Sequence, residues 1–314
     1  MKTTAMAAPL ISMFPAGLHS IQREILKGKI EKRSLGKTGE KLSMIGFGGI
    51  VVDQATPEQA AARVAEAVDF GVNYFDVAPT YGNAEEMLGP ALQPYRKKVF
   101  LACKTQERKR EGALRELDQS LEYLKTDHFD LYQLHAVTDP ADVDTVFGKG
   151  GAMEAFLEAR EDGRVRYLGF SAHSVEAAMA LMDRFDFDTI LFPFNFATWY
   201  AGNFGPRVME RAKEKQMGIL ALKAMAWRPW EEGEERTNSK TWYKPLPTKE
   251  EADKGLRFTL SHPVTSAIPP GHEDLFSMGL RLATGFSPMD QEEIMAIKKK
   301  GLETKPLFSY PMQG

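Results

Sequence analysis

The stretch "GVNYFDVAPTYGNAEEMLG", residues 71–89, contains the unit from which we infer the fold. Its first part, residues 72–77, is a short apolar run typical of a buried strand, and Asp76 stands near its end. A turn with proline and glycine follows, and the sequence favours a helix from about Ala84. The stretch therefore predicts a strand, a turn and a helix, in that order.

The segment just before this stretch predicts a helix that leads into the strand. Thr56 and Gln59 have the spacing of a capping box, and Pro57 takes the first helical position. The apolar residues that share one face of this helix are Ala60, Val64 and Ala67.

The same alternation of strand and helix continues along the chain. The predicted strands cover residues 44–48, 72–77, 99–103, 131–134, 165–170, 189–192, 219–222 and 264–268. Strict alternation requires parallel strands with right-handed crossovers, and eight such units predict a closed (β/α)8 TIM barrel. An open doubly wound sheet is the alternative, but no GxGxxG motif follows the first strand. We also expect an N-terminal hairpin around residues 37–39 and an extra C-terminal helix.

The domain organisation is expected to be simple. Residues 31–314 show no linker-like change in composition and predict a single barrel domain, preceded by an extension at residues 1–30. Pro9 and Pro15 interrupt the apolar residues of this extension, which argues against a signal peptide and leaves export as a minor alternative. The longest break in the pattern covers residues 227–248, and loops of this length are often functional lids.

The composition excludes several functional classes. Apolar residues make up 43% of the chain and charged residues 26%, which is typical of a globular protein with a sizeable core. A net charge of -3 gives no indication of a nucleic-acid surface, and no apolar run is long enough to span a membrane. The single cysteine, Cys103, excludes an internal disulfide and fits a reducing, cytoplasmic location.

Four reactive side chains are expected at one rim of the barrel, because the carboxyl ends of parallel barrel strands converge there. Asp76, Lys104 and His135 end the second, third and fourth predicted strands, and Tyr81 lies in the loop after Asp76. Each of them alone also fits an ordinary structural role. Their coincidence at one rim favours a catalytic site.

The residue types fit the reduction of a carbonyl group. A free tyrosine has a pKa of about 10, and a neighbouring cation would lower it. We expect Lys104 to supply that cation, Asp76 to hold Lys104, and His135 to bind the substrate oxygen. Tyr81 would then donate a proton to the oxygen as it becomes negative, while a nicotinamide cofactor supplies the hydride.

A family resemblance is carried by "RSLGKTGEKLSMIGFGG", "GVNYFDVAPTYGNAEEMLG", "DHFDLYQLH" and "GRVRYLGFSAHS". From about residue 33 to about residue 282 the chain resembles an aldo-keto reductase of a divergent branch, similar to bacterial and archaeal members and without an iron–sulfur tail. The resemblance implies an NAD(P)H-dependent oxidoreductase that reduces an aldehyde or ketone. It also implies that Tyr81, as general acid, forms a catalytic tetrad with Asp76, Lys104 and His135, and that NADPH binds across the barrel mouth.

The resemblance also implies a set of cofactor contacts, with departures from the family pattern. Ser171 is kept after the fifth strand, but Ala172 replaces the usual amide residue, so His173 either takes over that contact or merely begins a helix. Lys223 could contact the cofactor phosphates or simply line the rim. The complete expected set is Gly49, Ser171, His173, Asn195, Lys223, Pro269 and Gly271.

The choice between NADPH and NADH depends on the segment after the eighth strand. Pro270 stands where the family commonly has a lysine. Glu273 and Asp274 lie at a predicted helix N-terminus. Their negative charges interact favourably with the helix dipole there but would repel a neighbouring phosphate. The resemblance implies NADPH, and the lack of basic residues in this segment keeps NADH as the alternative.

Two other functions are alternatives to carbonyl reduction. One is a cofactor-binding redox sensor on the same barrel, and the other is a metal-dependent lyase or hydrolase that uses Asp76, His135 and His173. The second is disfavoured because no HxH pair occurs and Lys104 would place a positive charge at the metal, so no metal is expected. The aromatic residues that could wall a substrate pocket, or belong to the core, are Phe47, Trp199, Tyr200, Trp227, Trp230, Trp242 and Tyr243.

Overall fold

The computed structural model describes residues 29–311, and its centre is an eight-stranded parallel sheet. The strands are β3 (Phe47–Gly48), β4 (Tyr74–Asp76), β5 (Phe100–Thr105), β6 (Phe129–Val137), β7 (Val165–Ala172), β8 (Thr189–Pro193), β9 (Gly218–Leu222) and β12 (Ser266–Ile268), and they pair in sequence order. The two edges meet through a parallel bridge between Ile45 and Ala267, and the N–H of Gly46 donates to the carbonyl of Ala267 over 3.0 Å. The predicted TIM barrel is therefore confirmed.

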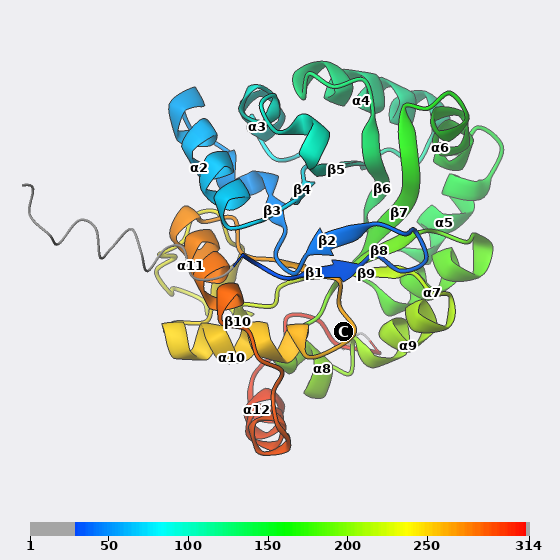
Figure 1. Cartoon of the computed structure of the whole chain (residues 1–314). Helices are drawn as coiled ribbons and strands as arrows, with labels where there is room; N and C mark the ends of the chain where they lie inside the picture. Colours follow the sequence, from blue (N-terminus) through cyan, green and yellow to red (C-terminus); the bar gives the residue numbers. More distant parts are fainter. Residues whose placement is uncertain (1–28, 312–314) are drawn as a thin grey trace, which may run out of the picture.

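The helices that follow the strands surround this barrel (Figure 1). They are α2 (Pro57–Asp69), α3 (Ala84–Leu92), α4 (Arg110–Tyr123), α6 (Ala152–Glu161), α7 (Val175–Arg184), α9 (Pro206–Glu214), α10 (Lys249–Leu260) and α11 (Glu273–Thr284). The extra C-terminal helix, α12 (Gln291–Glu303), projects from the body of the molecule and packs against α8 (Phe196–Tyr200). None of the helices within residues 29–311 is long and apolar enough to cross a membrane.

Helix α2 shows how the local sequence signals operate. The capping box is present, since the side chain of Thr56 accepts from the N–H of Gln59 and that of Gln59 accepts from the N–H of Thr56. The three apolar residues of the predicted face, Ala60, Val64 and Ala67, are the residues of this helix that are buried.

The hairpin of β1 (Lys32–Ser34) and β2 (Lys41–Ser43) covers the end of the barrel that faces the viewer in Figure 1. Leu35 and Leu42 are completely buried and belong to a cluster that fills the barrel interior at this end. Their partners in this cluster include Tyr74, Phe100 and Leu131 from the barrel strands. The hairpin was predicted, and it closes the barrel opposite the carboxyl ends of the strands.

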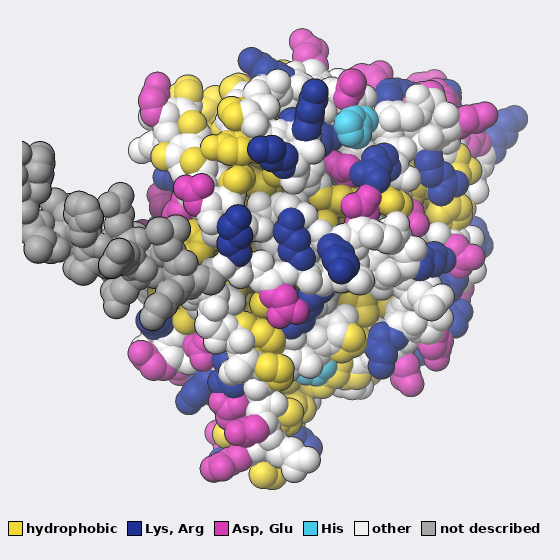
Figure 2. Space-filling view, viewed as in Figure 1, with side chains coloured by type: hydrophobic (Ala, Val, Ile, Leu, Met, Phe, Trp, Pro, Cys, Tyr) yellow, Lys and Arg dark blue, Asp and Glu magenta, His cyan; other side chains and the backbone are white. Residues whose placement is uncertain are grey.

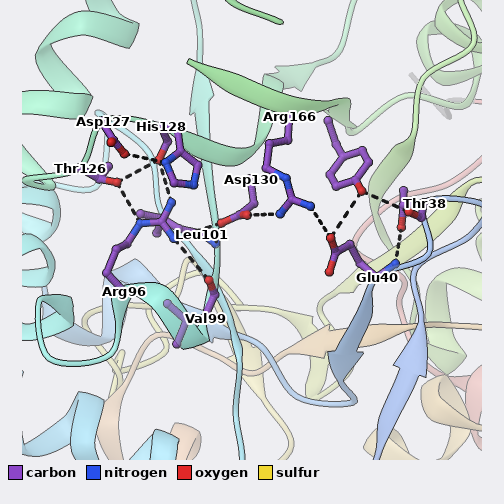
Figure 3. A network of polar contacts seen from close by, with 11 residues as sticks. Thr38, Glu40, Arg96, Val99, Leu101, Thr126, Asp127, His128, Asp130 and Arg166 are labelled. Atoms are coloured by element: carbon purple, nitrogen blue, oxygen red, sulfur yellow. Dashed lines mark hydrogen bonds and ion pairs between the residues drawn. The ribbon is translucent and has the colours of Figure 1, made fainter. Parts of the chain in front are cut away.

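An ionic network fastens this hairpin to the barrel (Figure 3). Buried Asp130 accepts from Arg96 over 3.2 Å, from Arg166 over 2.6 Å and from the N–H of Leu101 over 2.9 Å. Arg166 also pairs with Glu40 just before β2, over 2.5 Å. Figure 2 shows that basic and acidic side chains are both spread over this face. We interpret the network as stabilising the fold, because the active sites of such barrels lie at the opposite end.

Several elements were not predicted. Within the break at residues 227–248, β10 (Ala226–Pro229) pairs antiparallel with β11 (Tyr243–Pro245). Helix α5 (Pro140–Phe147) and the short α8 were also missed. Elements of three to eight residues give little periodic signal, which explains these omissions. The expected extension at residues 1–30 lies outside the described residues except for its last two.

Candidate active site

The predicted reactive residues meet in a cavity of about 330 Å³ at the carboxyl ends of the barrel strands. Asp76 ends β4, Lys104 lies near the end of β5 and His135 near the end of β6. Tyr81 reaches the cavity from the loop after β4. The complete lining is Gly48, Ile50, Asp76, Thr80, Tyr81, Lys104, His135, Ser171, His173, Leu191, Leu222, Lys223, Lys240, Trp242, Tyr243, Ile268, Pro269, Pro270 and Gly271.

Strand periodicity explains why these side chains point inward. Alternate residues of a barrel strand face the interior. In β5, Phe100 and Ala102 belong to the interior cluster, so Lys104 follows on the same face, two residues further toward the mouth. The same alternation puts Asp76 above Tyr74, and His135 above Gln133.

Lys104 and Asp76 form a buried ion pair at the base of the cavity. Lys104 Nζ also donates to the carbonyl of Val77 over 3.1 Å and to the hydroxyl of Tyr81 over 3.3 Å. Burial lowers the pKa of Lys104, but the charge and hydrogen bond of Asp76, together with the contributions of Tyr81 and Cys103, more than offset this, so the net shift is upward and the ammonium stays charged.

Two residues that sequence reasoning missed hold the carboxylate of this pair. Oδ2 of Asp76 accepts from the hydroxyl of Tyr74 and from Nε2 of Gln133, each over 3.0 Å. Tyr74 lies two residues before Asp76, and Gln133 two residues before His135. Because alternate residues of a strand share a face, this spacing was the sequence signal that could have identified them.

Tyr81 differs from the expectation in its pKa. Burial raises the pKa of Tyr81 above its usual value, and the positive charge of Lys104 offsets only part of that rise. The prediction of a lowered pKa is therefore wrong for this state of the protein. The physical reason is that removing the phenol from water disfavours the phenolate more than one paired lysine favours it. Tyr81 is accordingly protonated at neutral pH.

His135 lies beside Tyr81, with their ring centroids 5.6 Å apart and their planes nearly perpendicular. Thr80 Oγ1 lies 3.5 Å from Nδ1 of His135, and Arg108 donates to the carbonyl of His135 over 2.9 Å. Burial, together with the nearby cations, lowers the pKa of His135 to about 2. The imidazole is therefore neutral and keeps one N–H for a hydrogen bond.

Ser171 and His173 line the cavity on the side of β7. Ser171 Oγ accepts from the N–H of Ala136 over 2.8 Å. The Nε2 atom of His173 is buried and has no partner among the described residues, and burial lowers the pKa of this histidine to about 3. A buried polar atom without a partner is costly, so this nitrogen fits a hydrogen bond to a bound molecule.

Lys223 occupies an unusual position on the cavity wall. Its backbone is left-handed, with φ of 68°, which is uncommon for a residue other than glycine. Its Nζ lies 5.3 Å from the ring centroid of Trp242 and 4.9 Å from that of Tyr243. Burial lowers the pKa of Lys223 to about 8.

The structure does not bring all the expected cofactor residues to the cavity. Asn195 is buried elsewhere, where its Oδ1 accepts from the N–H of Thr198 over 2.9 Å and caps α8. Gly49 begins a short 3-10 helix, and Gly48 lines the cavity in its place. Pro269 and Gly271 line the cavity as expected.

The aromatic candidates also divide into two groups. Trp242 and Tyr243 line the cavity. Phe47 belongs to the core and packs on Phe276 of α11, with centroids 4.9 Å apart. The remaining candidates lie outside the cavity wall, namely Trp199, Tyr200, Trp227 and Trp230.

The long loop and the C-terminal segment complete the mouth. Lys240 Nζ lies 3.4 Å from Glu273 and 3.3 Å from the carbonyl of Val51, so it fastens the loop to the barrel. Phe308 packs against cavity residues, with ring centroids 5.3 Å from His173 and 5.8 Å from Trp242. No group of three or more His, Cys, Asp or Glu within residues 29–311 is placed to hold a metal ion.

Fold and site together define a (β/α)8 barrel with a buried lysine–aspartate pair beside a tyrosine at its mouth. The sequence model of the aldo/keto reductase family matches residues 44–253, which is more than half of the chain. The protein belongs to this family of oxidoreductases.

Individual relatives agree with this assignment. An uncharacterized oxidoreductase, YqkF of Bacillus subtilis, is 25% identical over 300 residues, covering 86% of this chain and 96% of the relative. L-galactose dehydrogenase of Arabidopsis thaliana is 32% identical over 171 residues, covering 50% and 53%. The solved structure of aldo-keto reductase AKR11C1 from Bacillus halodurans, in its holo form, superposes with a TM-score of 0.69 at 23% identity, covering 90% and 98%.

Proposed function

We propose that the protein reduces an aldehyde or a ketone to an alcohol, with Tyr81 as the proton donor and a reduced nicotinamide as cofactor. The observation that carries the proposal is the 3.3 Å contact between the ammonium of Lys104 and the hydroxyl of Tyr81 inside a cavity at the barrel mouth. Asp76, Lys104 and His135 complete the proposed catalytic group.

The residues of the cavity fit a nicotinamide ring. Its carboxamide needs one acceptor and one donor, and the unpartnered Nε2 of His173 and the hydroxyl of Ser171 can serve. Leu191 and Leu222 provide apolar wall. When bound, a reduced nicotinamide supplies the hydride. We propose NADPH, with NADH as the alternative, and we include Pro269 and Gly271 among the contacts.

The protein's own residues handle the proton. Tyr81 is protonated at neutral pH and donates to the carbonyl oxygen as negative charge develops there. The charged ammonium of Lys104 then stabilises the phenolate that remains, and Asp76 keeps Lys104 in position. His135 is neutral and donates its N–H to the same oxygen.

The test is Tyr81→Phe, assayed with NADPH and a panel of aldehydes and ketones by nicotinamide absorbance. Loss of a positioned general acid should reduce kcat about 100- to 10,000-fold, while cofactor binding persists. Tyr95→Phe is the matched control, because Tyr95 packs against the core away from the cavity. Full turnover by Tyr81→Phe would show that the proton comes from elsewhere.

The same panel separates catalysis from the regulatory alternative. Tight NADPH binding with no turnover of any carbonyl would favour a redox sensor, whereas multiple turnovers would eliminate it. NADPH and NADH should be compared in parallel, because the acidic residues at the start of α11 argue against a strong preference for the phosphorylated form.

A further inference from the structure

Lys223 is a cation on the cavity wall without an acidic partner. The other charged groups of the lining are paired, since Asp76 binds Lys104, and Lys240 lies 3.4 Å from Glu273. Lys223 makes no ion pair with any carboxylate of residues 29–311, and burial is the sole cause of its shifted pKa. The cavity therefore carries one uncompensated positive charge, located at Lys223.

This ammonium is held in place. The rings of Trp242 and Tyr243 lie within cation–π distance of Nζ, at 5.3 and 4.9 Å. At its other end, the left-handed backbone is fixed by a turn in which the N–H of Ala226 donates to the carbonyl of Lys223 over 2.9 Å. An immobilised lysine loses little further freedom when it binds an anion.

The ammonium also lies on the reacting side of the cavity. Lys223 lines the same cavity as Tyr81, His135 and His173, and its charge contributes to lowering the pKa of both histidines. The cavity measures only about 330 Å³, so an anion at Lys223 and a carbonyl oxygen at Tyr81 can belong to one small molecule. The phosphates of a dinucleotide, in contrast, are separated from its nicotinamide by a ribose.

We infer that the cavity selects carbonyl compounds that also carry a carboxylate, and that Lys223 binds this carboxylate. The inference rests on the proposed carbonyl reduction and specifies its substrate class as oxo acids. Lys223 acts here as a specificity-determining residue. The expected contribution of a charge-assisted contact of this kind is about 10- to 100-fold in kcat/KM, mainly through KM.

The test compares oxo acids with their methyl esters, with one to four carbons between carbonyl and carboxyl groups. Wild type should prefer the acid at one spacing or more by at least about tenfold. Lys223→Met should remove that preference, Lys223→Arg should restore part of it, and Lys213→Met on the exposed face of α9 should keep it. Equal use of acid and ester by wild type would overturn the inference.

A second arm distinguishes a substrate carboxylate from a cofactor phosphate. The dissociation constants of NADPH and NADH, measured by fluorescence, should change less than about twofold in Lys223→Met. A tenfold loss of affinity for both cofactors, with the preference for acids unchanged, would assign the anion to the cofactor and overturn the inference.

A third arm does not need turnover. Saturated carboxylic acids titrated into the protein without cofactor should change the tryptophan fluorescence, because Trp242 adjoins Lys223. The signal should be absent in Lys223→Met and in Trp242→Phe, and its presence in Lys223→Met would overturn the carboxylate site. If the wild type reduces neutral carbonyls but carboxylic acids do not change its fluorescence, the carboxylate inference is wrong and the proposed carbonyl reduction stands. If it reduces none, the proposed function fails, and the titration still tests the site.

Discussion

At the scale of single residues, Gly82 forms a left-handed turn directly after Tyr81. Gly82 has φ of +57°, and a Cβ atom there would lie 2.2 Å from Oδ1 of Asp53. Gly82→Ala should therefore strain the left-handed turn and displace the side chain of Asp53, and we expect the turn to move the phenol away from Lys104. Because misplacing a reacting group by about 1 Å can cost about 100-fold, we expect kcat/KM to fall about 10- to 100-fold.

The control for this change is Gly233→Ala, at a glycine with φ of +76° and no atom within 4 Å of the added Cβ. Both variants carry the strain of a left-handed alanine, but only Gly82→Ala meets Asp53. If the two variants have the same kcat/KM, the turn does not position Tyr81.

The titration of the site gives a second prediction at this scale. The pKa of His135 is lowered to about 2 and that of His173 to about 3, whereas burial raises the pKa of Tyr81 above 10. Both histidines are thus neutral and the phenol protonated throughout pH 5 to 7. The kcat/KM for a neutral carbonyl should stay within about twofold over this range. An inflection near pH 6.5 would show that an imidazole changes its charge during catalysis.

Single residues also show what the sequence could predict of the site. Asp76, Lys104 and His135 could be located because strand ends in a parallel barrel share one rim. The sign of the Tyr81 pKa shift could not, because it depends on how far the phenol is removed from water. The capping role of Asn195 could not be predicted either, because the helix that it caps, α8, has only five residues.

At the scale of elements, the loop between β10 and β11 is fastened by Lys240 to Glu273 at the start of α11. Glu273→Gln weakens this ion pair, which should let the loop open more often. An exposed pair contributes about 0.2–1 kcal/mol, so trypsin should cleave after the exposed Arg236 about two- to fivefold faster. Mass spectrometry of the fragments measures the rate.

Glu292→Gln in the first turn of α12 is the control for the loop experiment, because this exposed glutamate is remote from the loop. Cleavage of Glu273→Gln at the control rate would show that other contacts hold the loop closed.

The helices and strands differ in how well they could be predicted from the sequence. Helix α2 was predictable in detail because its cap, its first-turn proline and its apolar face all agree. The strands β10 and β11 were not, since their pairing joins two short segments across an irregular loop and includes a register shift.

At the scale of the whole molecule, we propose that residues 31–314 form one domain whose two ends have separate tasks. The end covered by the hairpin stabilises the barrel, and the network at Asp130 tests this. Asp130→Ala removes the carboxylate partner of Arg96 and the acceptor of the N–H of Leu101, and should cost about 3 kcal/mol of unfolding free energy. Urea unfolding measures the loss, and kcat should remain unchanged because the network is remote from the cavity.

Asp118→Ala serves as the comparison, since Asp118 pairs with Arg164 through a largely exposed side chain and should cost less than about 1 kcal/mol. Similar losses in the two variants would show that Asp130 has no special role.

The packing of Phe308 has a practical consequence for anyone who purifies this protein. Phe308 contacts His173 and Trp242, and the N–H of Tyr310 donates to the carbonyl of Gly202 over 2.7 Å. Because Phe308 adjoins cavity residues, kinetic constants should be collected on protein from which any C-terminal tag has been removed.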